Sequence, residues 1–201
     1  MVSCTTPSAP VVQQSVPTLP RVHINHAVAG QRASKQGAVR VDISLVSSTA
    51  QLLAPGGVLL AEMDVSPGLP GRERPVGRFR VTEKMPMKLS NLYGQYVMKD
   101  TREVVVVRPW EHKGPKPDGT VYQGIAMPFW MRLTGDGVGM HVGGFSREQP
   151  SSYGCIRCPE EGQQFFYNHC RVGTPVAVHN GPHPVPSALE SPEAPVPVPA
   201  F

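Results

Sequence analysis

The sequence contains no hydrophobic run of the roughly 18 residues that a membrane-spanning helix requires. Its longest run of β-branched residues is Val104 to Val107, so we expect no segment that crosses a bilayer. The net charge of +4 is too small to indicate a nucleic-acid partner, and 201 residues are too few for a two-domain enzyme. With 40% hydrophobic residues, the chain can still form the buried core of one domain.

Cysteine is scarce, and the spacing of its four positions excludes a disulfide framework. Three of the four, Cys155, Cys158 and Cys170, fall within sixteen residues. The sequence after Cys158, Pro-Glu-Glu and then two phenylalanines, predicts a helix over residues 159–169. Such a helix holds Cys158 and Cys170 about 18 Å apart, beyond the ~7 Å limit for a disulfide. We therefore predict that these two are unpaired and that Cys170 is a small buried hydrophobic residue.

A second Cys-x-x-Cys motif is also missing, which argues against a zinc ribbon around Cys155 and Cys158. His169 and Cys170 are adjacent in sequence, so their side chains leave the chain on different sides. No βαβ unit accompanies the motif, as a thioredoxin-like redox site requires. We predict no metal ligands and no cofactor, and a zinc or redox module remains as an alternative interpretation.

Prolines are few in the middle of the chain and gather at both ends, with four in residues 1–38 and seven in residues 181–201. The amino-terminal residues 1–37 are rich in Pro, Ser and Gln, which predicts a disordered tether. Residues 181–201 predict a disordered tail that favours extended, polyproline-like conformations. The folded domain is expected over residues 38–180.

Within that domain, alternating hydrophobic and polar residues predict a mainly β fold. Strands are expected over residues 39–45, 49–53, 58–65, 77–82, 103–107, 138–141 and 174–179. The single convincing helix is 159–169. Residues 84–123 carry several Gly and Pro motifs and predict a long irregular loop, of the kind that often forms a lid or a binding loop.

Cys155 is a candidate nucleophile by its surroundings. The amino end of the predicted helix lies four residues away and favours negative charge. His141 ends a predicted strand, and the loop over residues 142–150 allows Cys155 to return beside it as the partner of a base. Gly154 permits a tight turn whose amide groups are free to receive an oxyanion. A single His before a Gly-Cys pair is by itself more often structural.

Several longer blocks of sequence resemble the L,D-transpeptidase catalytic domain of the YkuD type. The blocks are VRVDIS over 39–44, SPG over 66–68, PVGRFRVT over 75–82, MPFWMRLT over 127–134, GMH over 139–141, PSSYGCIRCP over 150–159 and VGTPV over 172–176. They occur in family order, and the resemblance runs from about Val39 to His179. It implies a YkuD-type β-sandwich or barrel-like domain with one short helix after the nucleophile.

One residue in these blocks departs from the family pattern. Tyr153 stands where the usual Ser-His-Gly-Cys motif has its His. Because His141 matches the upstream His that the family uses as base, we expect this exchange to alter substrate fit or loop packing and to leave catalysis in place. The interval from His141 to Ser152 is short for the family, which bears on the shape of the loop.

The resemblance implies an enzyme that acts on peptidoglycan stem peptides through a Cys thioester. Cys155 is the expected nucleophile and His141 the base, with an oxyanion hole from the amides of Tyr153, Gly154 and Cys155. The products are 3-3 cross-links, or a partner anchored to the wall, with release of D-Ala. Carbapenem-type inhibitors are the expected covalent ligands. A catalytically inactive wall-binding relative and an L,D-carboxypeptidase are the alternatives.

Four further residues are candidates for binding substrate. Arg157 is expected either to pair with a substrate carboxylate or to hold the loop beneath Cys155. Ser152 is expected to bond within the turn, and Tyr93 and Trp130 are candidates for a cleft wall, with core packing as the other role for Trp130. No acidic residue follows His141, so a main-chain carbonyl from residues 142–144 is expected to orient its second nitrogen.

The implied substrate lies outside the cytoplasmic membrane, so a cell-envelope, periplasmic location is expected. No complete export signal with its apolar region is visible in the sequence. Met1-Val2-Ser3-Cys4 resembles the end of a bacterial lipoprotein signal, which makes Cys4 a candidate for lipid attachment. A chance cysteine near the start of the sequence is the alternative.

Overall fold

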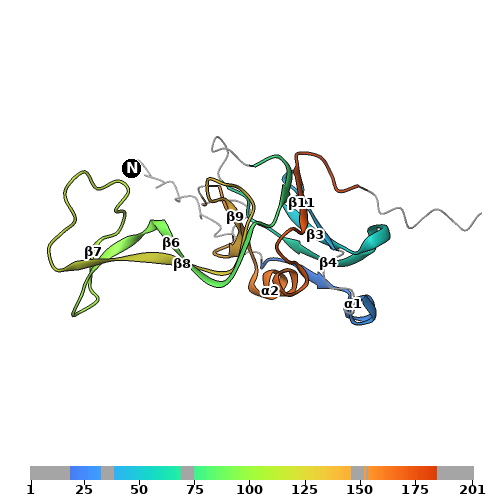
Figure 1. Ribbon diagram of the computed structural model, residues 1–201, viewed down its shortest axis with the longest axis horizontal. Coiled ribbons are helices and arrows are strands. Elements are labelled where there is room, and N and C mark those ends of the chain that lie inside the picture. The colour runs from blue at the N-terminus through green and yellow to red at the C-terminus, as the bar shows by residue number, and fades with distance from the viewer. Residues whose placement is uncertain (1–18, 33–38, 69–74, 146–151, 153, 185–201) are drawn as a thin grey trace, which may run out of the picture.

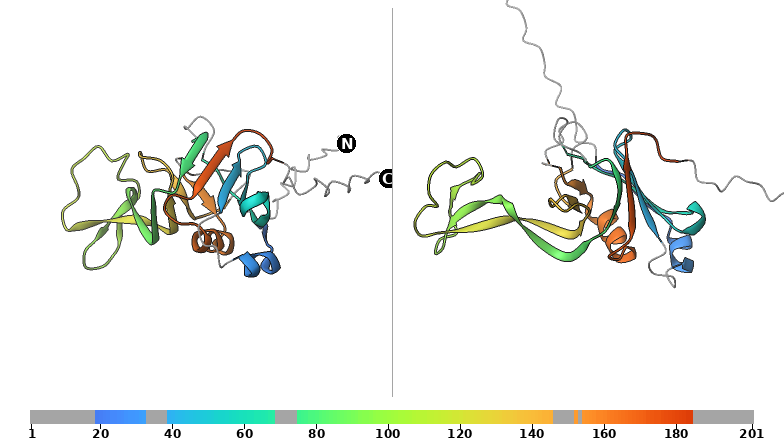
Figure 2. Two further views of the ribbon diagram at one scale, coloured as in Figure 1. Left: turned by 45° about the vertical axis from the view of Figure 1, so that its right-hand side comes forward. Right: turned by 45° about the horizontal axis from the view of Figure 1, so that its top comes forward.

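The computed structural model describes residues 19–32, 39–68, 75–145, 152 and 154–184. Its strands form two sheets, which confirms the mainly β fold (Figures 1 and 2). The first sheet has the order β1-β4-β3-β2-β11-β5 and the second the order β10-β9-β8-β6-β7. In the described part of the chain, neither helix is long and apolar enough to cross a membrane.

The first sheet contains most of the strands predicted from alternation. Its members are β1 (Val22–Ile24), β2 (Arg40–Ser44), β3 (Thr49–Leu53), β4 (Leu59–Asp64), β5 (Gly77–Arg80) and β11 (Pro175–His179). Val41 and Ile43 on β2, and Val176 and Val178 on the parallel neighbour β11, all belong to the hydrophobic core. One face of this sheet therefore packs inward. A short 3-10 turn, η2 (Pro55–Gly57), joins β3 to β4.

The helix α2 (Glu160–His169) packs against this core, one residue shorter than predicted. Pro159 is its N-cap, with an extended backbone, and Phe166 is fully buried. A Cβ at Gly162 would lie 2.6 Å from Sδ of Met63 on β4, so only glycine permits this close approach. Cys158 and Cys170 flank the helix as free thiols and both lie in the core, which confirms their prediction as unpaired residues.

We expect Cys170→Ser to lower the free energy of unfolding by about 1–2 kcal/mol, because a hydroxyl replaces a thiol in an apolar site. Cys170 is 3% exposed, and burial raises the pKa of its thiol to about 12. Urea unfolding measures the loss, with Cys170→Ala as a control that keeps the site apolar. An unchanged unfolding free energy in the serine variant would contradict the packing role.

The second sheet differs from the prediction. Its strands are β6 (Glu83–Met98), β7 (Val104–Val106), β8 (Thr120–Arg132), β9 (Gly139–Val142) and β10 (Ile156–Cys158). The predicted irregular loop over 84–123 is wrong for most of its length, because β6 and β8 pair as a long antiparallel hairpin. Figure 1 shows this hairpin projecting from the first sheet, with β7 at its far end. Within it, residues 99–103 and 107–119 remain without strand structure.

A bulge in the hairpin explains why part of β6 was predicted as an irregular loop. The pairing register shifts between Leu89 and Gly94, and the hydroxyl oxygen of Ser90 accepts hydrogen bonds from the amides of Leu92 and Tyr93. A Cβ at Gly124 would lie 2.0 Å from the carbonyl oxygen of Ser90. The turn signal in this segment therefore belongs to a bulge within a strand.

The predicted disordered tether over 1–37 is wrong for the part that the structure describes. β1 pairs with β4, and α1 (His26–Arg32) follows it. Arg21 forms a salt bridge of 3.3 Å with the buried Asp64. At the other end, the predicted tail over 181–201 includes described residues that contact the domain, since His183 bonds to Asp42. Described residues on both sides of the predicted domain 38–180 therefore contact it.

Candidate active site

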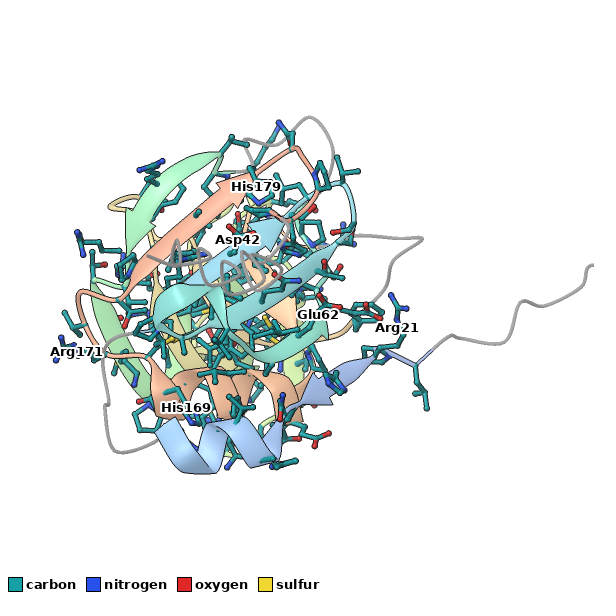
Figure 3. The ribbon with its side chains drawn as sticks, turned by 90° about the vertical axis from the view of Figure 1, so that its right-hand side faces the viewer. Arg21, Asp42, Glu62, His169, Arg171 and His179 are labelled. Carbon is teal, nitrogen blue, oxygen red and sulfur yellow. The ribbon has the colours of Figure 1, made fainter. Side chains whose placement is uncertain are left out.

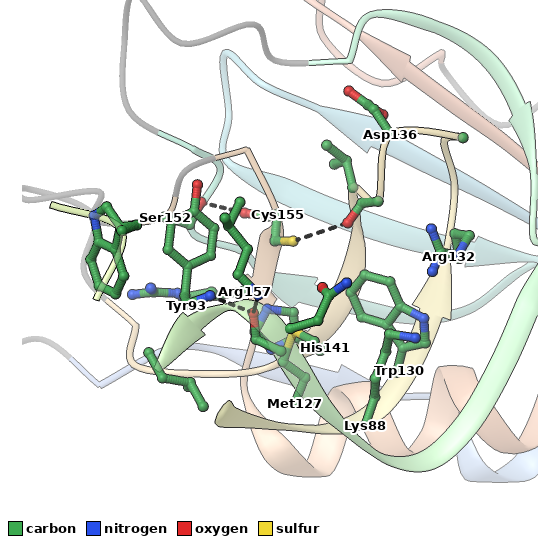
Figure 4. A pocket seen from close by; sticks show the side chains of 18 residues that line it. Lys88, Tyr93, Met127, Trp130, Arg132, Asp136, His141, Ser152, Cys155 and Arg157 are labelled. Carbon is green, nitrogen blue, oxygen red and sulfur yellow. Dashed lines mark hydrogen bonds between the residues drawn. The ribbon is translucent and has the colours of Figure 1, made fainter. Parts of the chain in front are cut away.

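Cys155 lies directly before β10, in a turn that its neighbours hold in shape. The hydroxyl of Ser152 donates to the carbonyl oxygen of Cys155 at 2.5 Å (Figure 4). Gly154 has a φ of +128°, in the region that favours glycine. Tyr153, the third predicted oxyanion donor, lies outside the described residues. Ser152 was predicted to bond within the turn and to bind substrate, and this hydrogen bond is the first of those two roles.

The segment after β4 supports this turn from behind. Ser66 and Arg157 exchange two main-chain hydrogen bonds of 2.8 and 2.9 Å, which tie β10 to the end of β4. A Cβ at Gly68 would lie 2.9 Å from the Cα and amide nitrogen of Gly154. A side chain at position 68 would therefore displace the backbone beside Cys155, which gives a physical reason for the Ser-Pro-Gly block.

Strand pairing brings His141 and Cys155 to the same face of the second sheet. β10 runs parallel to β9, with Arg157 opposite His141. Because alternate residues of a strand share a face, Cys155 lies on the same side as Arg157 and His141. Gly139 lies on that side too, and its missing side chain leaves room for Trp130, whose ring carbons would be within 2.9 Å of a Cβ there.

His141 is 6% exposed, and its ring orientation is fixed. Its Nδ1 lies 2.8 Å from the carbonyl oxygen of Val142, as predicted from the lack of a nearby acid. A carbonyl oxygen only accepts, so Nδ1 carries the proton in the neutral ring and Nε2 is left as the basic nitrogen. The indole of Trp130 packs beside the ring, with centroids 6.0 Å apart.

Cys155 and His141 line one pocket of about 430 Å³ (Figure 4). The hairpin provides one wall, which includes Tyr93, Ile125 and Met127. Trp130 is 1% exposed yet still lines the pocket, so it combines the two roles that the sequence left open. All the predicted site residues that the structure describes, except Gly154, line this pocket.

The lining residues that sequence reasoning missed include Lys88, Trp110 and Arg132. Trp110 comes from the irregular segment after β7, and its ring stands edge-on to Tyr93 with centroids 5.1 Å apart. Nothing in the spacing of Trp110 signals this contact, because it depends on the fold of the whole hairpin. Lys88 and Arg132 come from the paired strands β6 and β8, which the sequence did not identify.

Positive charge surrounds the pocket. Lys88, Arg132 and Arg157 line it, and Asp136 is the single acidic residue among the described residues that do so. Glu83 holds the first two in place, with ion pairs of 2.9 Å to Lys88 and 3.5 Å to Arg132. It also accepts a hydrogen bond of 2.8 Å from the Trp130 indole. The hydrogen bond from Lys88 helps to lower the pKa of Glu83, so this carboxylate stays charged. The arrangement suits a ligand that carries carboxylates.

Burial sets the protonation states of the two central residues. It raises the pKa of the Cys155 thiol above its ordinary value, although a main-chain hydrogen bond from Gly139 and the charge of Arg157 act in the opposite direction. Burial also lowers the pKa of His141, and the charge of Arg157 lowers it further. The hydrogen bond to the Val142 carbonyl acts in the opposite direction and raises this pKa. At neutral pH the pair is therefore a neutral thiol and a neutral imidazole.

This result corrects the expectation that a helix start would favour the thiolate. β10 separates Cys155 from α2, and desolvation has the largest effect on the thiol. The other cysteine of the Cys-x-x-Cys motif, Cys158, is fully buried in the core, and burial raises its pKa as well. Packing in the hydrophobic core therefore accounts for the cysteine at position 158.

A family model described as the L,D-transpeptidase catalytic domain (YkuD) matches residues 38–178, which is more than half of the chain. The comparison with curated protein sequences found no match to this chain.

Solved L,D-transpeptidase structures share the fold. One from Stackebrandtia nassauensis has a TM-score of 0.52 and 17% identity, covering 72% of this chain and 57% of that one. One from Mycobacterium smegmatis has a TM-score of 0.52 and 20% identity, covering 71% and 59%. L,D-transpeptidase 3 from Mycobacterium tuberculosis, in complex with a faropenem-derived adduct, has a TM-score of 0.50 and 22% identity, covering 70% and 60%. This chain thus spans about three fifths of the length of each.

Proposed function

Because the chain belongs to the family of L,D-transpeptidase catalytic domains of the YkuD type, we propose that it is a peptidoglycan L,D-transpeptidase with Cys155 as nucleophile and His141 as base. The observation that carries this proposal is the shared pocket of these two side chains, with His141 Nδ1 bonded to Val142 so that Nε2 is the basic nitrogen. The products are 3-3 cross-links, or a partner molecule joined to the wall.

In the acylation step, Nε2 of His141 takes the thiol proton as the Cys155 sulfur attacks a carbonyl carbon of the donor stem peptide. That carbonyl joins the third residue, a meso-diaminopimelate linked through its L-centre, to the terminal D-Ala. The amides of Gly154 and Cys155, with that of Tyr153, receive the oxyanion. His141 then returns the proton to the departing D-Ala amine, and a thioester remains on Cys155.

In the second step, the side-chain amine of an acceptor stem attacks the thioester. His141 removes a proton from that amine and gives it to the Cys155 sulfur as the new amide forms. Water in place of the amine would make the protein an L,D-carboxypeptidase. Since the resting thiol and imidazole are both neutral, proton removal and sulfur attack accompany one another, and no preformed ion pair is required.

The charge of the pocket supports this substrate class. A stem peptide that ends in D-Ala and contains diaminopimelate carries more than one carboxylate, and Lys88, Arg132 and Arg157 line the pocket that would receive it. Peptidoglycan lies outside the cytoplasmic membrane, so the proposal includes a cell-envelope, periplasmic location. Lipid attachment at Cys4, which lies outside the described residues, remains part of this proposal.

The proposal predicts one covalent adduct per chain after treatment with a carbapenem, because the strained lactam carbonyl accepts the same sulfur attack. Intact-mass spectrometry should show the added mass, and peptide mapping should locate it on Cys155. The matched control is Cys155→Ala, which should show none. An unmodified wild-type chain would favour the inactive wall-binding alternative, and an adduct on another cysteine would remove the assignment of the nucleophile.

A further inference from the structure

A second group of polar side chains lies on the opposite face of the first sheet. Oδ1 of Asp42 on β2 lies 2.9 Å from Nε2 of His179 on β11 and 2.6 Å from Nδ1 of His183. Figure 3 shows Asp42 and His179 side by side on their neighbouring strands. The three ligand atoms lie within 4.8 Å of one another. Two imidazoles and one carboxylate therefore converge on a single point.

This group is set into the protein surface. Asp42 is 6% exposed, and the side chain of His183 is 12% exposed. Placing a carboxylate in such a position is costly unless a positive charge or good hydrogen bonds compensate it. In the structure, both compensating partners are histidines, which bind metals as well as protons.

We propose that Asp42, His179 and His183 bind one divalent transition-metal ion, with Zn²⁺ as the ion that the ligands suit best. Two imidazole nitrogens and one carboxylate oxygen form a ligand set that zinc accepts in proteins. The ion joins β2, β11 and the segment after β11, and so fastens that segment to the sheet. This inference does not depend on the proposed function.

The spacing of the ligands requires only small side-chain rotations. A tetrahedral zinc ion with bonds of about 2.0–2.1 Å holds its ligand atoms about 3.3 Å apart. The two nitrogens now lie 2.6 and 2.9 Å from the carboxylate oxygen, slightly closer than that. His179 is 28% exposed, so this side of the group is open to water as a fourth ligand.

A hydrogen-bond partner outside the ligand set favours the tautomer of His183 that can bind a metal through Nδ1. Its Nε2 lies 2.7 Å from Oγ1 of Thr49, which in turn lies 2.7 Å from the Ser47 hydroxyl. A hydroxyl can accept as well as donate, so Thr49 accepts from Nε2–H when Nδ1 faces a metal. Ligand histidines in metal sites commonly have a hydrogen-bond partner of this kind on the other nitrogen.

The group is separate from the candidate active site. Along β2, Val41 and Ile43 point into the core, and Asp42 between them points to the other face. Along β11, Val176 and Val178 do the same, with His179 on the outer face. Metal bound at Asp42 should therefore leave the pocket around Cys155 unchanged.

The experiment titrates the chelator-treated full chain with Zn²⁺ against a chromophoric competitor, with metal analysis after desalting. We expect one Zn²⁺ per chain in the wild type. Asp42→Asn and His183→Ala should each weaken binding by at least about 100-fold, and Thr49→Val by about 10-fold, in the range of a lost outer partner. His23→Ala, which changes an exposed histidine on β1, is the matched control and should bind as the wild type does.

A second measurement separates this group from the cysteines, which also bind zinc. Co²⁺ in place of Zn²⁺ should give the visible bands of a nitrogen- and oxygen-ligated ion without a sulfur charge-transfer band, and Cys155→Ala should keep the metal. Zinc lost on Cys155→Ala, retained at full affinity by His183→Ala, or not held by the wild type would overturn the proposal. Should Asp42→Asn not fold, His183→Ala decides, because His183 lies after the last strand, β11.

Discussion

Replacing Cys155 with alanine is expected to lower the rate of D-Ala release from a tetrapeptide donor by at least about 10⁴-fold, because the variant has no atom that can form the thioester. The remaining residues still bind and orient the donor, so its affinity should change little. Chromatography of the released D-Ala measures the rate, and mass spectrometry of the products detects cross-linked dimers.

The same substitution should leave the fold intact. Cys155 is half-buried, and its sulfur makes a long contact of 4.0 Å with the Gly137 carbonyl. We expect the free energy of unfolding to change by less than about 1 kcal/mol. Cys170→Ser is the matched control, with lower stability and unchanged turnover. Cross-linking retained by Cys155→Ala would end the assignment of the nucleophile.

The first sheet could be predicted from the sequence because one of its faces is buried. Val41 and Ile43 alternate with polar neighbours, and that period of two is the signal of a half-buried strand. β1 carries little of this signal. It is three residues long, and its position depends on pairing with β4 and on the ion pair between Arg21 and Asp64. Local sequence does not reveal such partners.

The β6–β8 hairpin shows a different limit. Much of it is exposed on both faces, including Met87, Leu89 and Ile125, so hydrophobic residues do not mark one side. Its pairing relies on the approach of Gly124 to the Ser90 carbonyl, a contact across 34 positions of sequence. The prediction of a binding loop there was still useful, because the hairpin wall does line the candidate active-site pocket.

The residues of the site could be predicted from the sequence, whereas the protonation states of Cys155 and His141 could not. Cys155 and His141 stand in blocks whose order is that of the family, and strand pairing between β9 and β10 brings them to one face. The protonation states follow from burial, which a linear sequence does not report. The sequence does not bring the proposed ligands Asp42 and His179 together for a similar reason: they are 137 positions apart and meet only because β2 and β11 are neighbours.

Replacing His141 with asparagine is expected to lower turnover by about 10²–10⁴-fold, because general-base catalysis contributes a factor of this size. The asparagine amide can still donate to the Val142 carbonyl in place of Nδ1–H, which preserves the local structure. It cannot take a proton from the thiol. Thermal unfolding of the variant controls for a loss of fold, and a rate like that of the wild type would exclude His141 as the base.

The pH profile gives a second readout of the same residue. Burial lowers the pKa of His141 below its ordinary 6.5, so the neutral base persists as pH falls, and the acid limb of kcat/KM should lie below pH 6.5. Burial raises the pKa of the Cys155 thiol above 9.0, so the neutral pair persists until pH exceeds that value. The wild-type profile should be flat between these limits.

In His141→Asn the acid limb should disappear, because no imidazole remains to be protonated, whereas carboxylates of the substrate would produce the same limb in both proteins. An acid limb that is unchanged in the variant would therefore assign it to substrate or to another residue. Because desolvation sets both pKa shifts, an opened pocket should move both limbs toward neutrality. Gly68→Ala tests this, since its Cβ would press on the Gly154 backbone and displace the turn that shields Cys155.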